Sequence, residues 1–457
     1  MGKTLIRNVS IVLDDGQCSG SLFIDGDSIA EILPDEKKAD GDTGYNRSVN
    51  FEKRADSVID GKGGLLFPGI IDDHVHFREP GLTHKGSIES ESRAAVAGGV
   101  TSFFDMPNCI PQTITIQAIH DKCATASESS LANYSFYLGA TRQNLPEIEK
   151  VDPTAVCGVK LFMGSSTGGM LVDDDEHIFQ VFRSSPVPVA VHCEDTDIIG
   201  RNMEYYSVKC GGEPPVEYHP LIRSAEACYA SSSRAVSLAE KAGARLHLLH
   251  ISTAREMSLL QNCTLQEKHV TAEACPGYLF FSDEDYRKLG TRIKVNPSIK
   301  GDSDRQALRT ALISGLIDVI GTDHAPHLLS EKQGGCISAS SGMPVLPFSL
   351  PCMLELADEG LITVPDISRL MCHNPAIIFG IRRRGYIRKG YKADLTLVAR
   401  CENTALDATV PNKCGWTPFN GHSFGWKVIS TWVNGNLVYD NGEFFSEHKG
   451  EQIIFNR

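Results

Sequence analysis

The clearest structural signal in this sequence is Gly69-Ile70-Ile71-Asp72-Asp73-His74-Val75-His76-Phe77. Short apolar runs of this kind are typical of parallel β-strands that are covered by helices on both faces. Similar runs recur as far as Ile317–Asp323, and helical segments such as Ser87–Ala97 and Ser224–Ala242 lie between them. The eight strands predicted in this way are Gly69–Phe77, Val100–Met106, Asn133–Leu138, Gly158–Met163, Val187–Cys193, Arg245–Ile251, Val270–Ala274 and Ile317–Asp323.

Eight alternating β/α units predict an α/β fold, with a (β/α)₈ TIM barrel over residues 67–382. A doubly wound open sheet produces the same local pattern and is the alternative. In a barrel, catalytic groups are expected at the carboxyl ends of the strands, where the long loops meet.

The two ends of the chain have a different pattern. Thr4–Ile32 alternates apolar and polar residues and is broken by Asp-Gly and Gly-Asp turns, which is typical of antiparallel strands. The same alternation returns at Ala393–Val398 and Trp426–Val433. We therefore predict one smaller β-sandwich domain composed of residues 1–66 and 383–457, with the polar segment Asp35–Arg54 as a solvated loop.

Composition excludes several classes of function. The chain has 44 basic and 57 acidic residues, a formal net charge of -13, so a nucleic-acid phosphate backbone would be repelled. Met1–Val12 lacks the apolar core of a secretory signal, and no apolar run is long enough to span a bilayer, so we expect a cytoplasmic protein without membrane contact. The 14 cysteines form no CxxC pair and are expected to be free thiols. A metal site must therefore use histidine and carboxylate ligands.

Histidines stand at the ends of three predicted strands. His74 and His76 are two residues apart on one strand and share a face, so both imidazoles can reach one metal ion. His192 and His250 end the fifth and sixth strands. Each alone is as readily a core histidine as a ligand, but their common position at one end of the barrel favours a metal site.

Lys160 lies inside the apolar strand Gly158–Met163, where lysine is rarely buried without a partner or a function. Burial lowers the pKa of an amine, and the neutral amine can add carbon dioxide to form a carbamate that bridges two metal ions. A snorkelling surface lysine fits poorly between Val159 and Leu161. A Schiff-base lysine is the other alternative, but it does not need the surrounding ligands.

Asp323 ends the last predicted strand and completes the ligand set. Its carboxylate can bind one metal and exchange a proton with the attacking hydroxide, which makes it the candidate catalytic residue. Imidazole and carboxylate ligands favour two zinc ions, with cobalt or manganese as alternatives. The predicted metal ligands are His74, His76, Lys160, His192, His250 and Asp323.

This arrangement resembles the amidohydrolase superfamily, which has HxH after the first strand, a carbamylated lysine on the fourth, histidines after the fifth and sixth, and aspartate after the eighth. Within the superfamily, three motifs are similar to those of the dihydroorotases. They are Pro68-Gly69-Ile70-Ile71-Asp72 running into His74-Val75-His76-Phe77-Arg78-Glu79-Pro80-Gly81, Gly98-Gly99-Val100-Thr101 leading to Met106-Pro107-Asn108, and Val295-Asn296-Pro297-Ser298 preceding Gly321-Thr322-Asp323-His324-Ala325-Pro326-His327.

The resemblance implies reversible cyclisation of N-carbamoyl-L-aspartate to L-dihydroorotate, a step of pyrimidine synthesis. A metal-bridging hydroxide would attack the ring carbonyl, and Asp323 would pass its proton to the leaving nitrogen. Arg78 and Asn108 would bind the substrate carboxylate, and Asn296 and His327 would complete the substrate site. A salt bridge from Arg78 to Glu79 or Glu89 is the structural alternative.

Two other functions remain open. An allantoinase or hydantoinase would act on an uncharged ring, and allantoinases usually lack the arginine at position 78. A non-catalytic scaffold of this fold typically loses metal ligands.

The sequence also leaves a homo-oligomer open, as a dimer or a tetramer. It departs from the family twice: many dihydroorotases have aspartate in place of Lys160, and the segment Lys332–Pro347 is expected to be more flexible than the usual Ala-Pro-rich loop.

Overall fold

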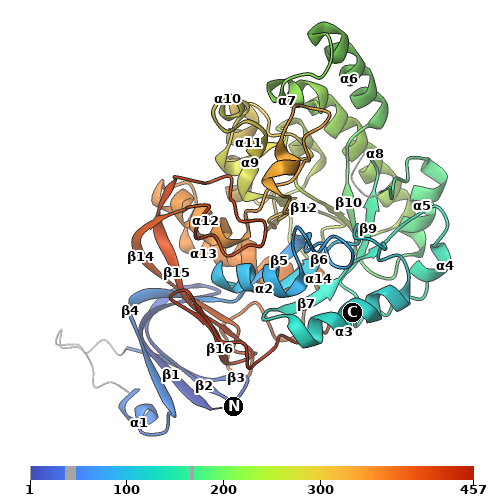
Figure 1. The fold of residues 1–457 in the computed structure, drawn as a ribbon. Coiled ribbons are helices and arrows are strands. Elements are labelled where there is room, and N and C mark those ends of the chain that lie inside the picture. Colours follow the sequence, from blue (N-terminus) through green and yellow to red (C-terminus); the bar gives the residue numbers. More distant parts are fainter. Residues whose placement is uncertain (1, 36–47, 165–168) are drawn as a thin grey trace.

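The computed structural model describes residues 2–35, 48–164 and 169–457. It consists of a barrel and a smaller β domain beside it, and strands from both ends of the chain form that β domain (Figure 1). Among the described residues, no helix has the length and apolar character needed to cross a bilayer. All 14 cysteines are free thiols, as predicted.

The barrel strands pair in parallel in chain order, as predicted. Leu138 N–H donates to Gly158 O and links the third strand, which is split in two, to the fourth. A bridge between Val75 and His324 joins the first strand to the last, so the sheet is closed and the open-sheet alternative is wrong. The strands are β5 Ile70–Val75, β6 Val100–Asp105, β7 Asn133–Phe136 with β8 Leu138–Gly139, β9 Val159–Phe162, β10 Val189–His192, β11 Leu246–Leu248, β12 Val270–Ala274 and β13 Val319–Ile320.

Helices connect these strands on the outside of the barrel (Figure 1). Their ends follow local capping rules: the Ser87 side chain caps α2, and Gly243 ends α8 in a left-handed conformation, close to the predicted bounds. The longer helices are α2 Ile88–Ala97, α3 Ile116–Ser129, α5 Asp175–Ser184, α6 Thr196–Cys210, α8 Ala225–Ala242, α11 Asp302–Ile313 and α12 Ser349–Asp358. The short ones are α4 Leu145–Ile148, α7 His219–Ile222, α9 Pro276–Phe280, α10 Tyr286–Leu289, α13 Val364–Ser368 and α14 Asn374–Phe379.

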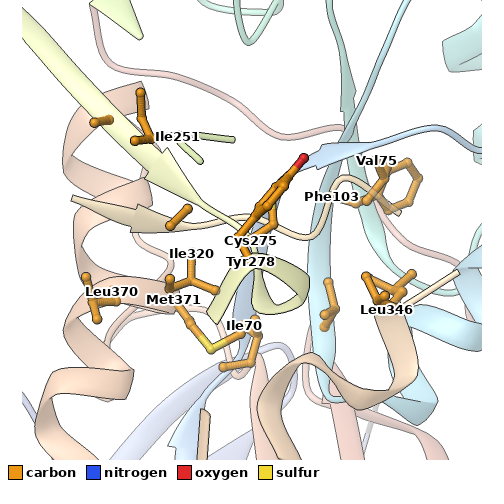
Figure 2. Packing of buried hydrophobic residues seen from close by; sticks show 14 of the residues in the cluster. Ile70, Val75, Phe103, Ile251, Cys275, Tyr278, Ile320, Leu346, Leu370 and Met371 are labelled. Carbon is orange, nitrogen blue, oxygen red and sulfur yellow. The ribbon is translucent and has the colours of Figure 1, made fainter. Parts of the chain in front are cut away.

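The barrel core is formed by side chains from strands that are distant in sequence. Figure 2 shows Ile70, Val75 and Phe103 of β5 and β6 in one cluster with Ile320 of β13 and Tyr278 of α9. The Tyr278 hydroxyl donates to Pro297 O at 2.8 Å, so its single polar atom has a partner. This packing fixes the strand ends that carry the polar groups.

The smaller domain is one eight-stranded sheet in the order β17-β16-β15-β14-β4-β1-β2-β3. β4 and β14 run antiparallel with Leu66 opposite Leu397, and this pairing joins the two ends of the chain. Ile6, Leu22 and Trp432 are buried in its core. The strands are β1 Lys3–Leu13, β2 Gly16–Asp25, β3 Ser28–Pro34, β4 Ser57–Pro68, β14 Leu395–Thr404, β15 Ser423–Val433, β16 Asn436–Asp440 and β17 Glu443–Phe444.

The predicted solvated loop Asp35–Arg54 is wrong at its end, where the short helix α1 spans Ser48–Glu52. The Phe51 ring lies 5.0 Å from the Phe23 ring, and the Arg54 guanidinium lies over Phe51, so this segment packs on the β domain. Residues 36–47 of the same prediction lie outside the described residues. The last residues of the chain return to the barrel, where Ile453 N–H donates to Tyr134 O.

Candidate metal centre and substrate pocket

The carboxyl ends of the barrel strands enclose one pocket. All the predicted metal ligands line it, together with three of the four predicted substrate residues, Arg78, Asn108 and Asn296. The fourth, His327, lies directly behind Arg78, with its Nε2 3.1 Å from Arg78 Nη2. The other lining residues are Phe162, Val295, Ala325, Ser341 and Gly342.

The ligand atoms fall into two neighbouring groups. His74 Nε2 and His76 Nε2 lie 3.3 Å and 3.1 Å from Asp323 Oδ1. His192 Nδ1 and His250 Nε2 face each other at 3.0 Å, and the His250 ring lies 5.3 Å from the His74 ring. The facing nitrogens of His192 and His250, next to the group of His74, His76 and Asp323, suit two adjacent cations, because each nitrogen then has a Lewis acid as partner.

The Nδ1 atoms of His74 and His76, which are not the nitrogens that face Asp323, form hydrogen bonds with other side chains. Glu273 Oε1 accepts from His74 Nδ1 at 3.0 Å and also from the His250 backbone N–H at 2.8 Å. Asn108 Oδ1 accepts from His76 Nδ1 at 2.8 Å. With Nδ1 as donor, each imidazole keeps its Nε2 lone pair free for a metal ion. Asn108 therefore supports a metal ligand in addition to lining the pocket.

Burial sets the charge state of the centre. It lowers the pKa of both His74 and His76 to about 4, so both rings are neutral near pH 7 and able to bind metal. Lys160 is 1% exposed, and burial lowers its pKa to about 8, so the neutral amine is accessible. These donors fit a binuclear divalent metal site.

Three residues of the pocket have left-handed backbone conformations that are rare outside glycine. The φ angles are 68° at Arg78, 40° at His250 and 48° at Asp323. Each costs on the order of 1 to 3 kcal/mol, and such strain is retained where it aims a functional side chain. Each of the three follows a barrel strand, where the chain turns into the site loops.

Arg78 is the buried cation of the substrate side. Its side chain is 6% exposed overall, and its Nε donates to Pro326 O at 3.0 Å. Among the described residues no carboxylate lies within ion-pair distance of its guanidinium. The proposed salt bridges are wrong: Glu79 accepts from the Ile88 backbone N–H, and Glu89 pairs with Arg93. Asn296 Oδ1 is also buried without a hydrogen-bond partner in the described part of the chain.

The segment Lys332–Pro347 is firmly held, contrary to the expectation of flexibility. The buried Lys332 Nζ donates to Lys294 O, Ser340 O and Gly342 O at 2.8 to 2.9 Å. These bonds fix the part of the segment that forms one side of the pocket, where Ser341 and Gly342 lie.

Sequence reasoning missed several residues that support the site. Glu273 lies in the apolar strand β12, so the rule that singled out Lys160 would also have found it. Asp73 and His247 form a second buried cluster with Glu273. Trp416 lies in a connection without periodic pattern and has no local signal, although its Nε1–H donates to His327 O at 2.7 Å.

Comparison with known proteins gives a consistent picture. The amidohydrolase family model matches residues 65–438. The chain is 34% identical to a dihydroorotase of Halobacterium salinarum over 92% of this chain and 99% of that protein, and 32% identical to an allantoinase of Deinococcus radiodurans over 98% of each. A solved structure of L-hydantoinase (dihydropyrimidinase) from Arthrobacter aurescens matches with a TM-score of 0.90 and 26% identity, covering 100% of both chains. Relatives with three different names thus share this architecture.

Proposed function

Since this chain belongs to the amidohydrolase family and is a metal-dependent cyclic amidohydrolase, we propose that it is a dihydroorotase, which interconverts N-carbamoyl-L-aspartate and L-dihydroorotate. The dihydroorotases among its relatives support this choice. Pyrimidine synthesis and a cytoplasmic location are parts of the same proposal.

The observation that carries the proposal is the buried guanidinium of Arg78. A buried charge is costly unless an opposite charge accompanies it, and none of the described carboxylates pairs with Arg78. A substrate carboxylate would supply that charge, with a fork geometry that guanidinium matches well. Asn296 Oδ1, which also lacks a partner among the described residues, can accept from a ring N–H of the same substrate.

The reaction uses groups already placed in the pocket. Two divalent ions, with zinc the expected metal, would polarise the ring carbonyl and make water a good nucleophile near neutral pH. Asp323 lies beside both His74 and His76 and is the group placed to take a proton from the attacking water and return it to the leaving nitrogen. Arg78 orients the ring through its carboxylate. The ring-closing direction uses the same contacts in reverse.

Lys160 completes the proposed metal site as a carbamate. Its amine lies on β9 in the same pocket as the four histidines and Asp323. Burial favours the neutral amine, which is the form that adds carbon dioxide. The resulting anion offsets the positive charge that two divalent ions bring into a buried site.

A hydantoinase or allantoinase is the second candidate. It is favoured by the 32% identity to the allantoinase and by the full-length match to L-hydantoinase. Such an enzyme would take an uncharged ring, which leaves the Arg78 charge without a counterion. The non-catalytic scaffold is disfavoured because all six predicted ligand positions are filled and converge. Assembly as a dimer or tetramer stays a prediction.

The deciding experiment compares rings that differ only in the carboxylate. Purified, zinc-loaded protein is assayed with L-dihydroorotate and dihydrouracil, and separately with hydantoin and allantoin. We expect kcat/KM for dihydroorotate to exceed that for dihydrouracil by at least a hundredfold. Preference for any uncharged ring would reject the dihydroorotase assignment.

A further inference from the structure

We propose that Trp416, a residue of the terminal β domain, is a positioning residue for the carboxylate-binding side of the pocket. It acts through His327 on Arg78, so the β domain contributes to substrate selection in the barrel. This inference rests on the proposed function, because it assigns a role in recognising the acidic ring.

Trp416 reaches the barrel from the connection between β14 and β15. Its side chain is 0% exposed, and its Nε1–H donates to His327 O at 2.7 Å. Asn412 holds the same turn, because its Nδ2 donates to Trp416 O and its Oδ1 accepts from Gly415 N–H. Trp416 is therefore held by hydrogen bonds at its backbone carbonyl and at its ring nitrogen.

His327 transmits this position to Arg78. Its Nε2 lies 3.1 Å from Arg78 Nη2, and its Nδ1 lies 3.2 Å from Lys85 Nζ. A neutral imidazole has one acceptor nitrogen, so the two cationic donors cannot both be satisfied by this ring. Lys85 also pairs with Glu331 at 2.8 Å, which leaves Arg78 as the cation that needs an anion.

Tight packing makes His327 sensitive to small displacements. A Cβ placed on Gly342 would lie 2.9 Å from His327 Cδ2 and 2.6 Å from Ala325 O, so this segment touches the ring closely. The Arg78 Nε bond to Pro326 O involves the residue just before His327. A shift of the His327 backbone therefore moves an acceptor of Arg78 and the ring beside its guanidinium together.

Two cations also lie close to the Trp416 ring. Arg292 and Lys332 lie 5.5 Å and 5.7 Å from the Trp416 ring, and Arg292 pairs with Asp407 of the same connection. Lys332 also holds the carbonyls of the pocket segment that includes Gly342. Trp416 thus links the two structures that border Arg78, the His327 turn and the Lys332-anchored segment.

The test removes the indole N–H and keeps an aromatic ring. Trp416→Phe is compared with Trp426→Phe, because the Trp426 Nε1–H donates to Asp358 Oδ2 and neither residue lines the pocket. Binding of orotate, the unsaturated analogue of dihydroorotate, and of uracil, the same ring without the carboxylate, is measured by calorimetry on zinc-loaded protein. Steady-state KM and kcat for dihydroorotate are measured in parallel.

We expect Trp416→Phe to weaken orotate binding roughly threefold to tenfold, the loss of about one buried hydrogen bond, with a clearly smaller change for uracil. The effect on dihydroorotate turnover should lie mainly in KM. Trp426→Phe should leave both ligands at wild-type affinity. If Trp416→Phe folds poorly, benzothienylalanine at position 416 keeps the bicyclic ring and removes only the N–H.

The outcomes separate the two proposals. Equal weakening of orotate and uracil, or no weakening, overturns the role of Trp416 while the dihydroorotase assignment stands. A wild-type protein that binds uracil as tightly as orotate overturns the dihydroorotase assignment, whatever the variants do. Selective loss of orotate affinity supports both.

Discussion

Replacing Arg78 with methionine removes the guanidinium and keeps an unbranched, uncharged side chain about as long as the arginine stem. The metal ligands stay in place, because Arg78 makes hydrogen bonds only to Pro326 and His327 among the described contacts. Metal content should therefore remain at the wild-type level, and the loss should fall on recognition of the acidic ring.

The magnitude follows from the surroundings of the guanidinium. Truncating one partner of a buried, charge-assisted pair costs about 2 to 5 kcal/mol. Lys85, the next cation beyond His327, is already paired with Glu331 and does not replace the lost charge, so the full range applies. This corresponds to a decrease in kcat/KM for dihydroorotate of roughly thirtyfold to several thousandfold.

The assay measures kcat/KM for dihydroorotate and dihydrouracil with wild type, Arg78→Met and the surface control Arg93→Met. Arg93 makes an exposed ion pair with Glu89 on α2, so its replacement should change neither substrate. If Arg78→Met slows both rings by the same factor, or leaves dihydroorotate unchanged, Arg78 does not recognise the carboxylate and the dihydroorotase assignment loses its main support.

Three further predictions concern the metal centre and the pocket segment. Lys160→Ala should remove the bridging carbamate and with it most of the activity and bound metal, and short carboxylic acids should restore part of the activity. Native mass spectrometry of the wild type should show the mass of the added carbon dioxide. An unmodified lysine in fully metallated, active protein would contradict this prediction. Glu273→Gln should weaken zinc affinity roughly tenfold to a hundredfold, because it perturbs the group that orients His74, and competition with a chelator measures this; unchanged affinity would argue against the orienting role. Glu213 accepts from the backbone N–H groups of Gly335, Ile337 and Ser338, and these bonds lower its pKa from 4.5 to about 2. Its stabilisation of this segment should be complete above pH 4.5 and lost as the pH falls toward 2, and hydrogen exchange at these three amides in wild type and Glu213→Gln checks it, since identical protection in both proteins would refute the role.

The parts of the site that were predictable share one physical signal. His74, His76 and Lys160 are polar groups within or at the end of apolar strands, where burial without a function is costly. The parallel direction of the strands then places them at the same end of the barrel. Glu273 has the same signal and was within reach of this reasoning.

The remaining features depend on contacts between distant segments. Trp416 meets His327 only after the β domain has packed on the barrel, and no periodicity in the sequence marks that contact. The sequence could not show that Arg78 lacks a carboxylate partner among the described residues. That depends on the positions of Glu79 and Glu89, which both interact with other groups. The order of Lys332–Pro347 was missed because its stability comes from one buried amine bound to three carbonyls, whereas its glycines and serines indicated mobility.

The pairing of β4 with β14 has a consequence for how the protein is made on the ribosome. β4 emerges early, and its edge has no partner on that side until Leu395–Val398 has been synthesised. Throughout translation of the barrel, the nascent chain therefore carries an exposed strand edge, the type of surface that promotes aggregation. The sheet is completed only after the barrel has been synthesised, so its closure is a late and slow step of folding. Chain termination before β14 would leave a barrel attached to an unfinished sheet, so residues 395–457 are needed to cover the β4 edge as well as to complete the domain.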